Sequence, residues 1–434
     1  MKKCIVIFVL CLLFPLLAGA VKVNIDGISY NIVKKLKQAE VTHLRESTVS
    51  IDGRTYVGSG YNLQNVDIPS SVMYEGVECY VTSIGNDAFG NCKTLTSITI
   101  PETVTSIGGA AFRGCSGLTS ITLPESVTSI GSAAFRYCTD LSSINIPESV
   151  TSIGSAAFYN CYSISSVVIP EGVPEIKYGT FEGCKSLVTI AIPKTVTSIG
   201  DYVFRNCCSL TSISLPDGIP YINYAMFEGC SSLTSISIPE SVTIIANNAF
   251  WGCSSLTNVT IPKNVTKIGN CAFEGCERLT SVTLPESLKI IYFGVFRNCE
   301  ELLDVYCYAE ALPETGVKVF ENSYVEHATL HVPEGSIEKY KSTEPWSDFG
   351  KIVALENSVN SSSFTPHVQC KGGVITLSGL SEYIEVSAYD VAGRKIDTAT
   401  TLYGTASLKV VNYVGSTVVI SIEGQQQGLK LVVK

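Results

Sequence analysis

Apolar and polar positions recur along the middle of the chain in a unit of 23 residues. Phenylalanine stands at the same place in ten successive units, with no insertion or deletion between them. These residues are Phe89, Phe112, Phe135, Phe158, Phe181, Phe204, Phe227, Phe250, Phe273 and Phe296. A fixed period of about 20 to 50 residues is the signature of a solenoid, in which each unit stacks on the next. We therefore expect a rod of ten stacked coils.

Each unit predicts one short strand followed by a turn back. In the stretch LTSITIP of the first unit, Leu95, Ile98 and Ile100 are expected to point inward. Ser97 and Thr99 alternate with them and are expected to point outward. Proline follows this stretch in nine units and ends the strand, because it cannot donate a hydrogen bond to a neighbouring strand. Two residues after each repeat phenylalanine, Gly or Asn stands in nine units of ten, which predicts a tight left-handed turn there.

A cysteine follows each repeat phenylalanine by three residues. These are Cys92, Cys115, Cys138, Cys161, Cys184, Cys207, Cys230, Cys253, Cys276 and Cys299. We favour a buried column of free thiols, since free cysteine is among the most buried residue types. Disulfides between adjacent coils are the alternative, but stacked side chains point the same way rather than at each other. A catalytic thiol would need a histidine beside it, and none lies between His43 and His327.

Composition and charge exclude several classes of protein. The 434 residues carry a net charge of −9, which argues against a nucleic-acid binder. With 45% hydrophobic residues the chain holds too much apolar material to remain disordered. His327 and His331 have the spacing of a helical zinc pair, but the segment HATLH lacks the glutamate of HExxH and alternates like a strand. No metal site and no cofactor are therefore expected.

The first twenty residues are typical of a secretory signal peptide. Lys2 and Lys3 precede an apolar run at 4–17, and the small residues at 18–20 offer a cleavage site. The run is shorter than the roughly 20 residues of a membrane-spanning helix. No later stretch is long and apolar enough to span a bilayer, so we expect an exported protein. Export makes disulfides the default, and the pairing of the remaining cysteines is left open: Cys79, Cys208, Cys271, Cys307 and Cys370.

The pattern divides the chain into six segments. We expect a signal peptide at 1–20, an N-terminal cap at 21–80, ten repeats at 81–307, a C-terminal cap of the solenoid at 308–356, a serine-rich linker at 357–369 and a small β-sandwich at 370–434. Caps are needed because an open end would expose unpaired strand groups. The last segment holds short alternating runs such as STVVISI between turn signals, which favours an antiparallel sandwich.

The outward strand positions form the surface that we expect to bind a partner. They are small hydroxyl and amide side chains, nearly uncharged, which is typical of a broad docking face rather than a pocket with convergent polar groups. The candidate residues are Ser97, Thr99, Ser120, Thr122, Ser143, Asn145, Ser212, Ser214, Ser235 and Ser237.

The position after the repeat phenylalanine is a second candidate surface, because its residue type varies most. It holds types that are enriched at binding hot spots, although exposure alone explains the variation equally well. The candidates are Arg113, Arg136, Tyr159, Arg205 and Trp251. A further column after the proline is acidic in four successive units, and a solvated face is the interpretation that we favour over a cation site: Glu102, Glu125, Glu148 and Glu171.

The repeat pattern CxxLxxIxLPxxVxxIGxxAF resembles the BspA-like leucine-rich repeat family of bacterial surface proteins over about residues 60–350. The entry segment IPSSVMYEGVECYVTSIG and the segment at 331–355 look like that family's start and its C-terminal cap. The resemblance implies a right-handed leucine-rich solenoid whose strands line one face. It also implies a surface-exposed protein that binds extracellular or host proteins or mediates aggregation between cells.

The C-terminal segment resembles the sorting domains of type IX secretion cargo. The residues that carry this resemblance, besides the terminal LKLVVK, are Tyr389, Asp390, Gly393, Arg394 and Lys395. It implies that the secretion machinery is a partner and that the protein is displayed outside the outer membrane. An accessory β-domain that only caps or spaces the rod is the alternative.

No acid–base pair and no inserted loop appear in the repeats, so no catalytic residue is assigned. An enzyme with its site in 308–434 would need clustered acid–base residues there, and none stand out. We therefore expect a non-catalytic adhesin. A structural spacer and a carbohydrate-binding surface protein are the alternatives. The aromatic platforms usual for sugars look sparse, because Trp251 and Trp346 are the only tryptophans.

Overall fold

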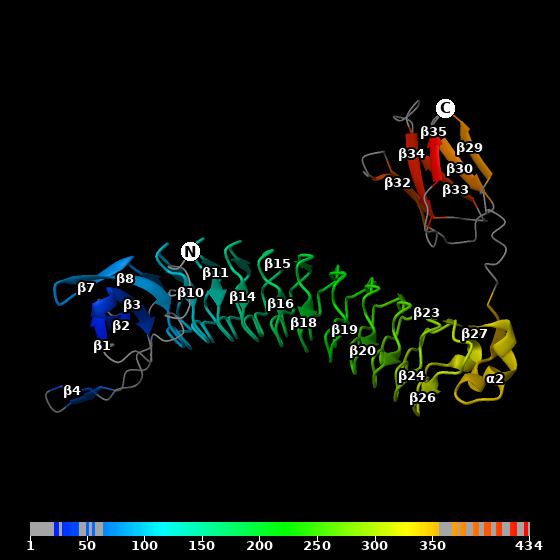
Figure 1. The fold of residues 1–434 in the computed structure, drawn as a ribbon, viewed down its shortest axis with the longest axis horizontal. Coiled ribbons are helices and arrows are strands. Elements are labelled where there is room, and N and C mark those ends of the chain that lie inside the picture. Colours follow the sequence, from blue (N-terminus) through cyan, green and yellow to red (C-terminus); the bar gives the residue numbers. More distant parts are fainter. Residues whose placement is uncertain are drawn as a thin grey trace. The chain divides into compact units, whose positions relative to one another are not determined.

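The computed structural model describes residues 21–25, 28–42, 49–51, 54–56 and 64–355, together with seven strands between 367 and 432. The chain divides into two compact units, Met1–Leu355 and Glu356–Lys434. The first unit holds the repeats, whose coils stack in a single row (Figure 1). The expected signal peptide at 1–20 lies outside the described residues.

A sheet precedes the first coil and continues into it. Its strands are β1 (Val21–Ile25), β2 (Ile28–Val33), β3 (Gln38–Thr42), β7 (Ser71–Tyr74) and β8 (Val77–Ile84), and the short helix η2 (Lys34–Leu36) links β2 to β3. Strands β1, β2 and β3 pair antiparallel, whereas β3 pairs with β8 in parallel. The end of β8 then pairs in parallel with the first repeat, so this sheet covers the open end of the solenoid. Strands β4 (Val49–Ile51) and β5 (Arg54–Tyr56) form a separate hairpin.

The predicted strand is present in the coils and pairs in parallel with its neighbours. These strands are β6 (Asn65–Asp67), β9 (Ser97–Thr99), β11 (Ser120–Thr122), β13 (Ser143–Asn145), β15 (Ser166–Val168), β17 (Thr189–Ala191), β21 (Asn258–Thr260), β23 (Ser281–Leu284) and β25 (Asp304–Cys307). Between β17 and β21 an isolated bridge joins Ser214 to Ser237. From β11 to β25 every paired residue stands 23 positions from its partner, as in Ser120 and Ser143. We call the outward side of these strands the strand face.

A second ladder of two-residue strands runs along another side of every coil, and the sequence analysis did not predict it. Its members are β10 (Ser106–Ile107), β12 (Ser129–Ile130), β14 (Ser152–Ile153), β16 (Glu175–Ile176), β18 (Ser198–Ile199), β19 (Tyr221–Ile222), β20 (Ile244–Ile245), β22 (Lys267–Ile268), β24 (Ile290–Ile291) and β26 (Glu314–Thr315). Glycine follows many of these strands, because the backbones of adjacent coils come too close there to leave room for a Cβ atom. A Cβ on Gly108 would lie 2.6 Å from the backbone carbon of Gly85.

The interior is built from identical residues stacked coil on coil. The ten repeat phenylalanines are buried, and their rings lie nearly parallel with centroids 5.0–6.2 Å apart. The expected left-handed turn two residues later is confirmed, and even Tyr137 adopts it with φ of 62°. A second left-handed position precedes the phenylalanine by two residues and holds alanine in several coils, such as Ala133 with φ of 55°. Alanine carries no signal for that conformation, so the sequence analysis missed it.

The last coils are followed by a C-terminal cap that contains short helices as well as strands. It comprises η3 (Val325–His327), β27 (Thr329–Val332), η4 (Glu334–Ser336), α2 (Ile337–Lys341), η5 (Trp346–Asp348) and β28 (Lys351–Ala354). Strands β27 and β28 extend the sheet of β25 in parallel. Trp346 and Tyr340 are fully buried, and Trp346 packs between Tyr340 and Phe320, the last ring of the stack.

The second unit consists of two antiparallel sheets, in agreement with the expected β-domain. One sheet contains β29 (His367–Lys371), β30 (Val374–Ser378) and β33 (Thr405–Lys409), and the other contains β32 (Lys395–Thr400), β31 (Glu385–Tyr389), β34 (Thr417–Ile422) and β35 (Leu429–Val432). Ile375, Val386, Leu408 and Ile420 are buried. Strand β29 begins inside the range 357–369 that the sequence suggested as a linker.

Candidate functional site

The strand face presents the predicted small polar side chains to solvent. All ten candidate residues are exposed, whereas the isoleucines between them are buried, as Ile121 and Ile213 are, or partly buried, as Ile144 is. The register places equivalent side chains beside each other, so Ser120 neighbours Ser143 and Thr122 neighbours Asn145. The result is a nearly uncharged surface that runs from coil to coil without a projecting loop.

Ionisable side chains appear where the strand face meets the cap. His331 Nε2 lies 2.8 Å from Asp304 Oδ1, and its ring stacks on Tyr306 with centroids 4.3 Å apart. His331 belongs to β27, as the alternation of HATLH indicated, whereas His327 ends the short helix η3. Within the described residues no group of three or more His, Cys, Asp or Glu side chains could hold a metal ion.

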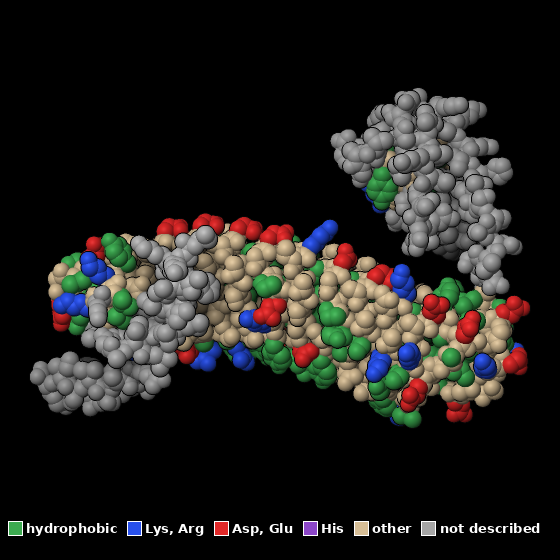
Figure 2. Space-filling view, in the orientation of Figure 1, with side chains coloured by type: hydrophobic (Ala, Val, Ile, Leu, Met, Phe, Trp, Pro, Cys, Tyr) green, Lys and Arg blue, Asp and Glu red, His purple; other side chains and the backbone are tan. Residues whose placement is uncertain are grey.

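The acidic column after the proline lies on the surface. Glu102, Glu125, Glu148 and Glu171 are all exposed. Figure 2 shows acidic side chains following one edge of the solenoid, with basic ones entering the same edge further along. This arrangement fits the solvated face that the sequence favoured.

The residues after the repeat phenylalanine contact one another along the rod. Arg205 bridges two buried carboxylates, one on the coil before its own and one on the coil after it. Its Nη1 lies 3.4 Å from Glu182 and its Nε lies 2.9 Å from Glu228. Arg297 pairs with buried Glu274 in the same way. These buried glutamates were not anticipated, because the column was treated as exposed.

The remaining hot-spot candidates of this column differ in how far they are exposed to solvent. Arg136 stacks on the rings of Tyr137 and Tyr159, at 5.0 and 4.5 Å from their centroids. Trp251 is 43% exposed. Arg113 lies at the surface and pairs with Asp87. Trp251 and Arg113 are therefore the hot-spot candidates that remain open to solvent.

Removing Arg205 is expected to destabilise the solenoid in a pH-dependent way. Burial raises the pKa of Glu182, and Arg205 opposes that shift. A raised carboxyl pKa contributes stability below the unfolded value, about 4.3, and that contribution is lost as pH rises through the folded pKa. Arg205→Leu should therefore cost about 1–3 kcal/mol near pH 7 and less near pH 4, measured by urea unfolding. The control is Arg113→Leu, which removes an exposed ion pair and should cost less than about 1 kcal/mol at both pH values. An equal loss of stability for Arg205→Leu at pH 4 and at pH 7 would contradict this account.

The ten cysteines of the column are buried free thiols, as expected. From Cys115 to Cys299 each Sγ donates to the carbonyl oxygen of the phenylalanine 26 residues earlier, as in Cys138 to Phe112 at 3.1 Å. The thiols thus pair with the backbone and not with each other. Burial raises the pKa of Cys138 and Cys184 to about 12, which keeps them protonated and unreactive at neutral pH.

Thiol accessibility tests this arrangement. In the folded protein at pH 8 without reductant, a disulfide-exchange reagent should leave the column cysteines unmodified for hours and react first with half-exposed Cys208. Denaturation should release all ten column thiols at once. Column thiols that stay unreactive in denaturant until reductant is added would instead indicate disulfides.

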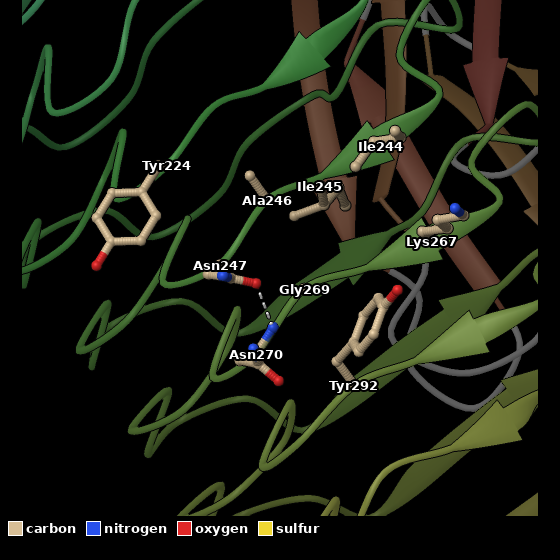
Figure 3. A pocket seen from close by; sticks show the side chains of 9 residues that line it. All are labelled: Tyr224, Ile244, Ile245, Ala246, Asn247, Lys267, Gly269, Asn270 and Tyr292. Carbon is tan, nitrogen blue, oxygen red and sulfur yellow. Dashed lines mark hydrogen bonds between the residues drawn. The ribbon is translucent and has the colours of Figure 1, made fainter.

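A hollow lies on the second ladder, at a place that the sequence analysis did not single out. Its volume is about 400 Å³, and its lining includes Tyr224, Asn247, Lys267, Asn270 and Tyr292. Figure 3 shows Tyr224 on one side and Tyr292 on the other, with the asparagines and Gly269 between them. The sequence signal for this hollow was that single units depart from the Ser-Ile-Gly consensus. Comparing all units position by position hides such departures.

The proposed sorting residues are described only in part. Tyr389 ends β31 and Lys395 begins β32, and the two residues are partners in the antiparallel register. Asp390, Gly393 and Arg394 lie outside the described residues. As for membrane insertion, the described part of the chain contains no helix with the length and apolar character that crossing a bilayer requires.

Comparison with known protein families gives one match. The family described as BspA type leucine-rich repeat region, a model of six repeat copies, matches the chain over residues 82–207, 151–277 and 220–341. Together these cover more than half of the chain. No curated protein matches the chain.

Solved structures include similar proteins. A leucine-rich repeat protein from Bacteroides ovatus is 30% identical with a TM-score of 0.54, and the match covers 77% of this chain and 76% of that one. A leucine-rich cell surface protein from Faecalibacterium prausnitzii is 25% identical with a TM-score of 0.45, covering 79% of this chain and 97% of that one.

Proposed function

Because the chain belongs to the BspA-type leucine-rich repeat family, we propose that it is a non-catalytic adhesin displayed at the cell surface, where its solenoid binds an extracellular or host protein. The observation that carries this proposal is the strand face, a continuous exposed surface repeated along the coils. Repeated coils create extended surfaces of the kind that repeat proteins use for protein partners. Such a surface has no enclosed site in which substrates could be held and converted.

The polar character of the strand face favours a folded protein as its partner. Small hydroxyl side chains such as Ser120 and Thr122 can donate and accept hydrogen bonds at little entropic cost. Their backbone groups are already paired with neighbouring coils, so an added strand would find no free ladder on this face. Contact would be made through side chains over several coils, where many weak interactions sum.

Display at the surface rests on the family and on the C-terminal unit. The chain's sorting-domain resemblance supports export with attachment outside the outer membrane, through the secretion machinery as a partner. Deleting 367–434 should leave the solenoid folded but move the protein from the cell surface to the medium or the periplasm. Unchanged surface display after this deletion would count against the sorting role.

The proposed function predicts saturable binding to a protein. The chain from residue 21 to 434 would be titrated over immobilised extracellular matrix proteins and polysaccharides, with the unit 356–434 as the control. We expect saturable binding to a matrix protein that the control lacks. Absence of binding across the protein panel would overturn the adhesin proposal and leave a structural spacer as the better account.

A further inference from the structure

The second ladder changes character in its C-terminal half. In the coils from β10 to β14 the outward residue of each two-residue strand is serine, whereas Tyr221, Ile244, Lys267 and Ile290 occupy this place in β19, β20, β22 and β24. Large side chains therefore occupy the place that serine holds in the first three strands of the ladder. Tyr221 is 44% exposed.

The hollow is bounded by aromatic walls and has a floor of small residues. Tyr224 forms one wall and is joined edge-to-face to Tyr202, which contacts Tyr178 in the same way. Tyr292, 40% exposed, forms the other wall. Between the walls the floor is Ala246 and Gly269. A Cβ on Gly269 would lie 2.5 Å from the backbone nitrogen of Asn247, so a larger residue cannot fill this floor without separating the coils.

The two asparagines in the hollow present hydrogen-bond donors. Asn247 Oδ1 accepts from the backbone N–H of Asn270 at 2.8 Å, and Asn270 Oδ1 accepts from that of Phe293 at 3.1 Å. These bonds fix which end of each amide faces the backbone, because only oxygen can accept. The Nδ2 groups are therefore turned away from these backbone donors, and the line of the first bond can be followed in Figure 3.

The hollow also carries a positive charge without a carboxylate among its lining residues. Lys267 is exposed and forms no ion pair among the residues that the structure describes. Lys289 is exposed directly before β24 on the next coil. A cation and two amide donors in a hollow with tyrosine walls call for a ligand that has acceptors, negative charge and apolar faces.

We propose that this hollow binds an acidic saccharide, such as a chain containing uronic or sialic acid. A pyranose ring has an apolar face of C–H groups that packs on an aromatic ring, and an edge of hydroxyls that accept from amides. Its carboxylate would pair with the Lys267 ammonium. The walls stand on coils three apart, roughly 14 Å at about 4.8 Å per coil, which is room for two to three sugar rings.

An acidic peptide fits the same surface less well. A bound peptide presents a backbone N–H donor beside every carbonyl, and neither the Lys267 ammonium nor the outward Nδ2 groups can accept a hydrogen bond. The backbone of β20, β22 and β24 is already paired on both sides, so it cannot add a peptide strand. The site lies apart from the strand face and does not depend on the proposed protein ligand.

Calorimetric titration of the full chain with acidic saccharides tests the proposal. The probes are oligomers of galacturonate and of hyaluronan, and sialyllactose, each compared with its uncharged methyl ester at low ionic strength. We expect at least one acidic saccharide to bind saturably, with its ester about tenfold weaker or worse and with affinity falling as salt rises. Tyr292→Ala and Lys267→Met should each weaken binding at least about tenfold. Tyr292→Phe, which keeps the ring, should retain most of the affinity.

Matched controls separate this site from general surface effects. Lys263→Met removes an exposed lysine that does not line the hollow and should leave saccharide binding unchanged. Tyr292→Ala should leave binding to a matrix protein unchanged, so a failure of either proposal can be recognised separately. The proposal is overturned if none of the acidic saccharides binds, if the hollow variants bind them as the wild type does, or if a Glu-rich peptide binds the hollow more tightly.

Discussion

Replacing Phe158 by alanine should lower the free energy of unfolding of the solenoid by about 3–5 kcal/mol. Its ring is fully buried and stacks between Phe135 and Phe181, with centroids 5.4 and 5.5 Å away. Alanine would remove both contacts and leave a cavity that the neighbouring coils cannot close without bending the stack. Urea unfolding followed by far-UV circular dichroism measures the loss, and the slope against urea should change little if the coils still unfold together.

Val168→Ala provides the control for this substitution. Val168 is a large apolar residue of the strand face that is 63% exposed, so its truncation should change stability by less than about 0.5 kcal/mol. Phe158→Leu should fall between the two variants, because leucine keeps most of the buried volume. A loss below about 1 kcal/mol for Phe158→Ala would mean that the phenylalanine stack does not hold the coils together.

Replacing Trp346 by alanine should open the C-terminal end of the solenoid. Its ring closes the stack through edge-to-face contacts with Phe320 and Tyr340, at 5.7 and 5.3 Å between centroids. We expect a local loss of about 3–5 kcal/mol, with faster amide exchange in β27 and β28 than in the central coils. Hydrogen–deuterium exchange resolved by peptide would locate the change. The freed edge should also make the variant associate at high concentration.

Trp346→Phe tests the same site without removing the aromatic packing. The indole Nε1 of Trp346 is buried and has no hydrogen-bond partner among the described residues. Phenylalanine removes that donor together with part of the ring, so the two effects offset each other and the net change should stay within about 1–2 kcal/mol. Equal amide protection of β28 in the wild type and in Trp346→Ala would contradict the role of this residue as the closure of the stack.

The repeat made the main features of the solenoid predictable. Ten copies of one pattern fix which positions are buried, so the inward Leu95, Ile98 and Ile100, the phenylalanine stack and the thiol column all followed from the sequence. The second ladder did not follow, because two residues are too few to show alternation. Alanine in the left-handed turn at Ala133 gave no signal either, since the neighbouring coils impose that conformation.

The surfaces were predictable only where the coils are alike. The strand face repeats, so its exposure could be inferred from one unit. The pairing of Arg205 with Glu182 and Glu228 depends on which residues happen to stand on adjacent coils, and reading that column as exposed hid three buried glutamates. The hollow likewise arises from departures in single units. Counting tryptophans as sugar platforms overlooked the tyrosines at its walls.

The most direct test of the central claim asks whether the strand face is the surface that binds the protein ligand. Binding to the immobilised matrix protein would be compared for three proteins: the unchanged full chain, the double variant Thr122→Glu/Ser143→Glu on the strand face, and the double variant Thr151→Glu/Thr243→Glu. Thr151 and Thr243 are exposed residues directly before β14 and β20 of the second ladder. We predict that the first pair weakens binding at least about tenfold and that the second pair has no effect. Equal binding by all three proteins, with unchanged folding, would show that the strand face is not the binding surface.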